Sequence, residues 1–220
     1  VTKCAPKADY QRKTVKGKSQ FEMLKQLELS YSDFMELFSH CKKNNLLFLS
    51  TPFDYQSAEF LDKLGVCAFK IGSGDLTNLP FLKTIAGYKK PMILSTGMST
   101  LNEVRESVKT IFSTGNRRLI LLHCTSNYPA KYSDINLRAI DTLKREFKVT
   151  VGYSDHTQGI EVSIAAVSLG ASVIEKHFTL GKKMIGPDHS ASLEPKEFKQ
   201  MIKSIRNIEG CLILKNELSF

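Results

Sequence analysis

The feature that most constrains the fold is a regular alternation of short apolar runs with longer amphipathic stretches, which begins at Leu46. Each apolar run is unbroken and bounded by turn residues, which is typical of strands buried on both faces of a parallel sheet. The runs predict six strands, at Leu46–Thr51, Ala68–Ile71, Met92–Ser95, Leu119–Cys124, Val149–Tyr153 and Val173–His177.

Helical patterns separate these runs. They predict helices at Ser57–Gly65, Leu79–Gly87, Leu101–Gly115, Ile135–Phe147, Gly159–Gly170 and Glu194–Glu209, with two more, Gln20–Leu27 and Ser32–Asn44, before the first strand. Gly65, Gly115 and Gly170 stand where a helix commonly ends in a left-handed residue. Pro195 and the acidic residues beside it mark the start of the last helix.

A repeated βα unit predicts parallel strands with helices outside them. The strands recur every ~22 to 30 residues, close to the spacing of a (β/α)8 barrel, although six strands cannot close an eight-stranded one. An open doubly wound sheet is the alternative, but it gathers its ligand groups at one switch point. Polar residues here end strand after strand: Thr51, Lys70, Ser73, Ser95, Thr96, Thr125, Ser154, His156 and His177. We therefore predict an α/β fold, a TIM (β/α)8 barrel lacking its first two strands in this chain, with a truncated N-terminus because the sequence begins at Val1.

Composition narrows the class of protein. The 220 residues suffice for one sizeable domain, and neither a long apolar run nor a signal peptide is seen, so we expect no membrane partner and a cytoplasmic location. The five cysteines lack zinc-site spacing and are expected to be reduced. The net charge of +9 comes from scattered lysines and arginines without a nucleic-acid motif, so we expect no nucleic-acid partner.

The last two predicted strands carry histidines at the same level. Side chains alternate along a strand, so Ser154 and His156 share one face, as do Glu175 and His177. Two imidazoles on adjacent strands can converge on one metal ion. The competing interpretation is that each histidine is a hydrogen-bonded structural residue, and the pattern by itself leaves the two about equally balanced.

Two segments are candidates for binding an anion. Lys70 on a strand is followed by Gly72-Ser73-Gly74, and Ser95-Thr96-Gly97 has the same arrangement before the next helix. Backbone N–H groups at helix starts, with a lysine for charge, form anion sites. Ordinary helix capping explains each segment equally well, but a lysine inside a buried strand requires a partner.

The chain resembles the N-acetylneuraminate (sialic acid) synthases over nearly its whole length. The segments that carry the resemblance, in the same order as in that family, are APKADYQ (5–11), SQFEMLKQLELS (19–30), FLSTPFD (48–54), FKIGSGDLTNLP (69–80), LSTGMST (94–100), LHCTSNYP (122–129), GYSDHTQG (152–159) and EKHFTLGKKMIGPDHSASLEP (175–195).

The resemblance implies a TIM barrel that condenses phosphoenolpyruvate with N-acetylmannosamine or a related sugar. It implies a divalent metal, Mn²⁺ first with Mg²⁺ or Co²⁺ as alternatives, held by His156 and His177. Lys70 and Asp188 join these histidines as expected catalytic residues. The expected substrate-binding residues are Thr51, Ser73, Ser95, Ser126, Asn127 and Ser154 toward phosphoenolpyruvate, and Asp75 and Tyr128, with Asp188, toward the sugar.

The same resemblance also indicates which parts of the family's enzymes have no counterpart in this sequence. The family carries a glutamate on its first strand, a lysine on its second and a C-terminal antifreeze-like domain, none of which matches a segment here. We therefore expect residues 1–220 to form a partial synthase barrel with little activity by itself, and the full-length form to be a homodimer. Alternatives are a legionaminic or pseudaminic acid synthase, a more distant octulosonate- or heptulosonate-phosphate synthase, or a truncated non-catalytic remnant that binds metal or ligand.

Overall fold

The computed structural model describes residues 3–8, 11–12 and 19–212 of the chain. Its centre is a five-stranded sheet in which every neighbouring pair is parallel and the strands follow chain order. The strands are β1 (Phe69–Ile71), β2 (Met92–Ser95), β3 (Leu119–Cys124), β4 (Thr150–Asp155) and β5 (Ile174–Lys176). All their carboxyl ends therefore open on the same edge of the sheet.

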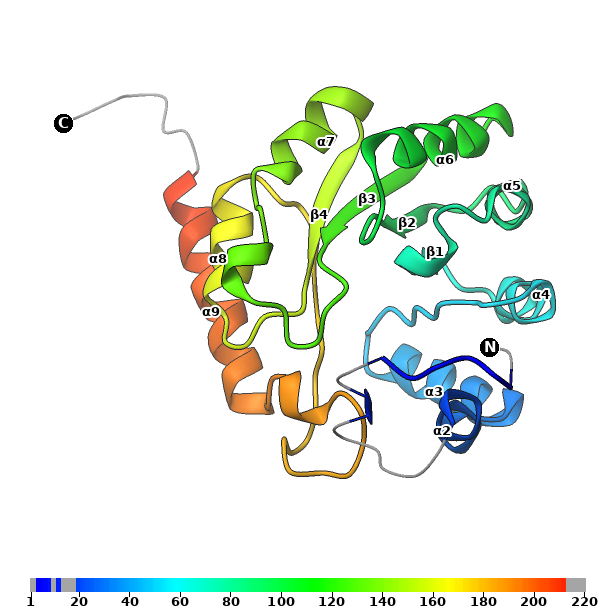
Figure 1. The fold of residues 1–220 in the computed structure, drawn as a ribbon, viewed down its shortest axis with the longest axis horizontal. Coiled ribbons are helices and arrows are strands. Elements are labelled where there is room, and N and C mark those ends of the chain that lie inside the picture. Colours follow the sequence, from blue (N-terminus) through cyan, green and yellow to red (C-terminus); the bar gives the residue numbers. More distant parts are fainter. Residues whose placement is uncertain (1–2, 9–10, 13–18, 213–220) are drawn as a thin grey trace.

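Helices alternate with the strands and surround the sheet on one side (Figure 1). They are α4 (Tyr55–Leu64), α5 (Leu79–Gly87), α6 (Leu101–Ser113), α7 (Ala139–Phe147), α8 (Glu161–Ser168) and α9 (Pro195–Leu212), preceded by α2 (Gln20–Leu27) and α3 (Tyr31–Lys43). Single 3₁₀ turns, η1 (Ser73–Asp75), η2 (Tyr132–Asp134) and η3 (His189–Ala191), lie in the loops. The βα alternation of a partial barrel is thus confirmed.

Local sequence signals explain where several helices begin and end. Thr100 and Glu103 form a reciprocal capping box at the start of α6, which satisfies backbone N–H groups that have no partner inside the helix. Gly65, Gly115 and Gly170 adopt positive φ angles at the helix ends, as predicted. The predicted helix Ile135–Phe147 begins later, at Ala139, because η2 and the left-handed Asn136 occupy the preceding residues.

The sheet is curled rather than flat. Lys70 on the first strand and Glu175 on the last bring Nζ and Oε2 to 3.5 Å, although three strands separate them in the sheet. A flat sheet would hold these strands ~19 Å apart, at about 4.8 Å per strand spacing. The sheet therefore has the curvature of a barrel wall, and its concave face encloses a space.

The predicted strand Leu46–Thr51 is wrong as a strand. The segment is extended, but it forms no ladder with any described strand, and β1 pairs only with β2. A strand needs a hydrogen-bonded neighbour, whereas an apolar run alone does not supply one. Leu46 and Leu47 are correspondingly 62% and 81% exposed, and Phe48 alone packs its ring edge-on against Phe34 and Phe38 of α3.

The main core lies between the sheet and its helices. Ile71, Leu94, Leu121 and Val151, one from each of four strands, are fully buried against residues such as Ile85 of α5. Burying a side chain of this size contributes about 1.5–3 kcal/mol. A second cluster, Val167, Leu193, Met201 and Ile205, joins α8 to α9 and secures the end of the sheet near β5.

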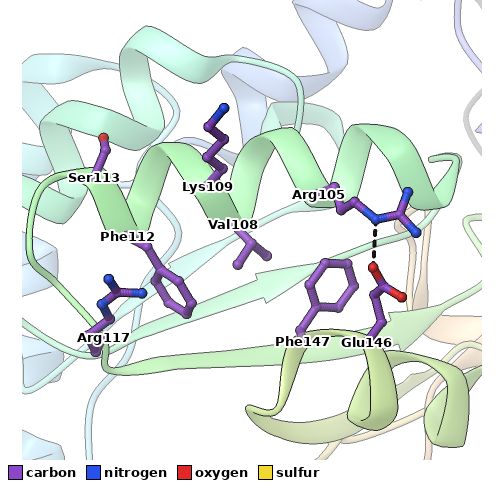
Figure 2. Close-up of a pocket in the computed structure, with 8 residues that line it drawn as sticks. All are labelled: Arg105, Val108, Lys109, Phe112, Ser113, Arg117, Glu146 and Phe147. Carbon is purple, nitrogen blue, oxygen red and sulfur yellow. Dashed lines mark hydrogen bonds and ion pairs between the residues drawn. The ribbon is translucent and has the colours of Figure 1, made fainter.

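No helix among the described residues has the length and apolar character needed to cross a membrane. A surface groove of about 480 Å³ lies between α6 and α7, where Arg105 pairs with Glu146 and the Arg117 guanidinium covers the Phe112 ring (Figure 2). Arg117 precedes β3, so this groove extends toward the amino ends of the strands, away from the polar residues that end them.

Candidate functional site

Lys70 is the centre of a cationic and hydroxyl cluster at the carboxyl ends of β1 and β2. Its side chain is 12% exposed, and its Nζ donates to Ser95 Oγ at 2.8 Å and to the Ile71 carbonyl at 3.3 Å. Ser73 opens the loop after β1, and its Oγ accepts from Gly97 N at 2.9 Å. The two predicted anion-binding segments are therefore brought together into one cluster.

Gly97 shows how closely this cluster is packed. A Cβ at Gly97 would collide with Ser126 Oγ, and it would lie 2.8 Å from Cys124 Sγ and 2.9 Å from Ser73 Oγ. Only glycine allows the hydroxyls and the backbone N–H to approach one another here. Cys124 is buried with its Sγ 3.1 Å from Ser73 Oγ, so it forms part of the wall.

Glu175 and Ser154 connect the lysine cluster to the histidines. They face each other in register across β4 and β5, and Ser154 Oγ donates to Glu175 Oε1 at 2.7 Å. The other carboxylate oxygen of Glu175 faces Lys70, and Ser154 Oγ lies 3.3 Å from His156 Nε2. A continuous series of polar contacts therefore runs from Lys70 to His156.

His156 is buried and held in one orientation. Its Nδ1 lies 2.7 Å from the Thr125 carbonyl, so Nδ1 carries the proton and donates, which leaves the Nε2 lone pair free to bind a cation. Burial lowers the pKa of His156 below its ordinary value, outweighing the opposite effect of the Thr125 hydrogen bond. The ring is therefore neutral at neutral pH, the form in which histidine binds metals.

His177, Tyr128 and Asp188 complete this end of the site. The His177 ring is nearly perpendicular to that of His156, at 5.5 Å between centroids, and the Tyr128 ring lies 4.0 Å and 5.2 Å from His156 and His177. Asp188 Oδ2 is 3.8 Å from His177 Nδ1. Its Oδ1 is buried without a hydrogen-bond partner among the described residues, which is costly unless a ligand satisfies it.

The donor set fits a divalent cation. It consists of two imidazoles that directly follow β4 and β5 and a buried oxygen of Asp188 that has no partner among the described residues. Within the described part of the chain, no group of three or more His, Cys, Asp and Glu side chains is already gathered as a metal site. Imidazole and carboxylate are nevertheless ligand types that divalent cations accept.

The other predicted residues lie around these two ends. Asp75 accepts from Asn78, and Asn127 is exposed and accepts from the Tyr128 N–H. Ser126 contributes to the packed wall around Gly97. Thr51 lines a cavity of about 630 Å³ together with Lys70 and Glu175.

Asp155 and Lys176, which precede the two histidines, are not among the site residues predicted from the sequence. They form an ion pair of 2.9 Å with side chains 0% and 1% exposed. Opposite charges at facing positions of two buried strands are the signal that could have identified them.

The fold and the site together define a class of protein. Parallel strands of a curled sheet present an anion-binding lysine cluster at one end and a pair of imidazoles at the other, all on the carboxyl edge where barrel enzymes hold their substrates. This is the layout of a (β/α)-barrel enzyme whose site lies at the carboxyl edge of the sheet.

Comparison with known proteins gives the family. The NeuB family profile matches residues 1–216, and the chain belongs to that family. It is 53% identical over 211 residues to the N,N'-diacetyllegionaminic acid synthase of Campylobacter jejuni, covering 94% of this chain and 63% of that protein. It is 42% identical over 194 residues to the N-acetylneuraminate-9-phosphate synthase of Drosophila melanogaster, covering 88% of this chain and 52% of that protein.

A solved structure of the same kind of synthase also matches the fold of this chain. The N-acetylneuraminic acid (sialic acid) synthetase of Leptospira borgpetersenii, in complex with citrate, matches with a TM-score of 0.87 and 34% identity, covering 96% of this chain and 74% of that one. The resemblance to sialic-acid-type synthases is therefore confirmed. The chain spans less than two thirds of the length of the two curated relatives, so the activity of the whole protein is a matter for proposal.

Proposed function

We propose that the whole protein condenses phosphoenolpyruvate with an N-acetylated amino sugar and water, giving a nonulosonate (a nine-carbon 2-keto acid) and inorganic phosphate. The observation that carries the proposal is the continuous polar path from Lys70 through Glu175 and Ser154 to His156. It places an anion-binding cluster beside a cation-binding pair. Family membership and the named relatives support the same reaction.

The reaction balances without an external oxidant or reductant. C3 of phosphoenolpyruvate forms a bond to the aldehyde carbon of the open-chain sugar, whose oxygen takes up a proton. Water then adds to C2, where positive charge has developed, and loses a proton. The resulting intermediate breaks its C2–O bond to phosphate and leaves the 2-keto acid.

In this proposal the lysine cluster binds phosphoenolpyruvate. Lys70 supplies a cation, Ser95 and Ser73 supply hydroxyls, and the Gly97 N–H adds a backbone donor. Charge-assisted hydrogen bonds of this kind are shorter and stronger than neutral ones. Ser154 orients Glu175 beside Lys70, Thr51 and Ser126 lie around this end of the site, and Asn127 is a further candidate to contact phosphoenolpyruvate.

The histidine end binds a divalent metal, which we propose to be Mn²⁺, with Mg²⁺ or Co²⁺ as alternatives. His156 and His177 would hold it, and the unpartnered oxygen of Asp188 would face it or a sugar hydroxyl. Such an ion acts as a Lewis acid on the sugar aldehyde. Tyr128 packs against both rings and limits the space open to the sugar, and Asp75 is the further candidate for a sugar hydroxyl.

The sugar is the finer part of the proposal. Identity is 53% to the diacetyllegionaminic acid synthase and 42% to the neuraminate-9-phosphate synthase, which favours a sugar with two N-acetyl groups over N-acetylmannosamine or its phosphate. Phosphoenolpyruvate contributes no nitrogen, so both acetamido groups of an N,N'-diacetylated product must come from the sugar. We also propose that the whole protein is a cytoplasmic homodimer, consistent with five free cysteines.

Isotope labelling of the complete protein tests the reaction. Phosphoenolpyruvate carrying ¹⁸O in its C2–O–P bridge is incubated with Mn²⁺ and, in parallel, with diacetamido and monoacetamido sugars. C–O cleavage places the label in the released phosphate, whereas P–O cleavage leaves it in the organic product. Phosphate release that needs no sugar, or label retained in the product, would contradict the proposal.

Two matched variants connect the reaction to the site. Lys70→Met should raise the KM for phosphoenolpyruvate by about 10- to 100-fold, since a hydrogen bond to a charged group contributes about 1.5–3 kcal/mol. Lys109→Met, in the groove of Figure 2, removes the same charge outside the site and should leave the KM unchanged. Equal effects from both variants would indicate general electrostatics rather than a built site.

A further inference from the structure

The ends of β4 and β5 are joined by a buried ion pair behind the histidines. Asp155 and Lys176 face each other in register, and their charged atoms lie 2.9 Å apart with side chains 0% and 1% exposed. Each residue immediately precedes a proposed metal-binding histidine, His156 or His177. The position of the pair is therefore tied to that of both rings through a single peptide unit on each strand.

Asp155 uses both carboxylate oxygens fully. Oδ1 accepts from Thr157 N at 2.9 Å and from Thr157 Oγ1 at 2.7 Å, while Oδ2 accepts from Ser163 Oγ of α8 at 2.6 Å as well as from Lys176. Lys176 Nζ also donates to the Thr157 carbonyl at 2.6 Å. The network therefore fixes β4, β5, the loop after His156 and α8 relative to one another.

The pair lies on the opposite side of the sheet from the site. Its in-register neighbours Ser154 and Glu175 bond to each other and contact Lys70 on the concave face, whereas Asp155 contacts α8 on the outer face. Alternation along the strands produces this separation. The charged atoms of the pair thus lie on the outer side of the sheet, although Lys176 also lines the cavity of about 630 Å³ beside Lys70 and Glu175.

Stability alone does not explain such a pair. Removing two charges from water costs free energy that their attraction only partly offsets, and apolar replacements of buried pairs are often neutral or stabilising. What a fully bonded buried pair does provide is one defined geometry, and partners behind metal ligands commonly control how those ligands point.

We propose that Asp155 and Lys176 are positioning residues that set the relative placement of His156 and His177 for metal binding. This inference rests on the proposed function, because it assumes that the two histidines bind a divalent ion. It adds to that function two residues that touch neither metal nor substrate and act through the backbone and α8.

The test compares Asp155→Asn/Lys176→Met with wild type in the full chain. The double variant keeps the side-chain sizes and the two bonds from Thr157 to Oδ1, removes both bonds of Lys176 Nζ, and leaves no unpaired charge. Mn²⁺ affinity is measured by calorimetry without substrate, and we expect it to fall by about 10- to 100-fold. Lys176→Arg, which keeps the pair, should bind within a few-fold of wild type.

A control separates this effect from the general loss of an ion pair. Asp62 and Lys90 pair at 2.7 Å near the amino end of β2, with side chains 33% and 24% exposed. Asp62→Asn/Lys90→Met should leave Mn²⁺ affinity unchanged. If the Asp155/Lys176 double variant fails to fold, Ser163→Ala takes its place, since it removes one bond to Asp155 and should weaken Mn²⁺ by about 3-fold, a cost within that of one lost hydrogen bond.

A measurement without metal distinguishes failure of this inference from failure of the proposed metal site. Ring ¹⁵N spectra should show wild-type His156 as a single tautomer protonated on Nδ1, and the double variant as a mixture, with His156→Ala providing the assignment. Unchanged spectra and unchanged Mn²⁺ affinity in the double variant, or in Ser163→Ala where that is used, would overturn the inference. If wild type itself binds no Mn²⁺, the proposed metal site fails, and the ring spectra alone decide the inference.

Discussion

The extended segment 46–52 and the β4–β5 pair begin from similar sequence patterns and reach different structures. Both are apolar runs that end in polar residues on the route to the site. In β4 and β5 the backbone groups pair with a neighbouring strand, and the side chains lie between the concave space and the helices. In segment 46–52 no strand pairs with the backbone among the described residues, and Leu47 is 81% exposed.

The difference shows that an apolar run forms a strand only where a neighbouring strand pairs with its backbone. Backbone N–H and C=O groups must find partners in a neighbour, and burial follows from the layers on both sides. β4 is paired with β3 and β5, whereas the contacts of segment 46–52 in the described structure include those of Phe48 with α3 and the main core, but no strand ladder. Substitutions matched between the two regions should therefore have very different effects.

The largest contrast is expected for leucine truncation. Leu121→Ala on β3 removes a side chain that is 0% exposed and should lower the free energy of unfolding by about 2–5 kcal/mol through lost burial and a cavity. Leu47→Ala should change it by less than about 0.5 kcal/mol. Urea denaturation of both variants measures the contrast. Similar losses would mean that segment 46–52 is packed like a strand.

The next effect concerns the ligands at the ends of β4 and β5. His156→Ala should weaken Mn²⁺ binding by about 100-fold or more, since even the outer partners of metal ligands commonly contribute 10- to 100-fold. Calorimetry with Mn²⁺ alone measures it, and His40→Ala on exposed α3 is the matched control. If His156→Ala still bound Mn²⁺ as wild type does, the metal would not be bound at the proposed site.

A smaller loss of stability is expected when a side chain is introduced between β4 and β5. A Cβ on Gly152 would collide with the Val173 carbonyl and lie 2.6 Å from Leu122 Cδ2, so Gly152→Ala should lower the free energy of unfolding by about 1–3 kcal/mol. Gly87→Ala at the end of α5 is the control, because its Cβ would meet nothing within 4 Å. If the two variants unfold alike, the strands are less tightly packed than the structure indicates.

The smallest expected effect is a pH dependence. Burial lowers the pKa of His123 on β3, against the opposing hydrogen bond to the Ile135 carbonyl. The unfolded chain thus binds the proton more readily, so the stabilisation is complete above the unfolded pKa of about 6.5 and is lost as pH falls below it.

His123→Gln keeps a donor to Ile135 and should lose less stability than wild type between pH 7.5 and 5, because glutamine takes up no proton when the chain unfolds. Denaturation at each pH measures the slope, and His40→Gln gives the background of a surface substitution. A variant slope equal to that of wild type would show that His123 titrates alike in both states.

Much of the site was predictable because the sequence carries alternation and turn chemistry directly. The βα order, the glycines that end helices and the convergence of Lys70 with Ser95 follow from rules that act over a few residues or from strand ends meeting at one edge. The Asp155–Lys176 pair was not anticipated, because it depends on which residues face each other across two strands, 21 positions apart.

The sequence by itself determined the class of fold, the family motifs and the residue types available for binding an anion and a cation. The tertiary structure decided which of them meet. It made Glu175 the link between Lys70 and Ser154. Among the described residues it left one oxygen of Asp188 without a hydrogen-bond partner and segment 46–52 without a neighbouring strand. The physical reason is that periodicity reports on local backbone geometry, whereas register, curl and burial depend on partners distant in the sequence.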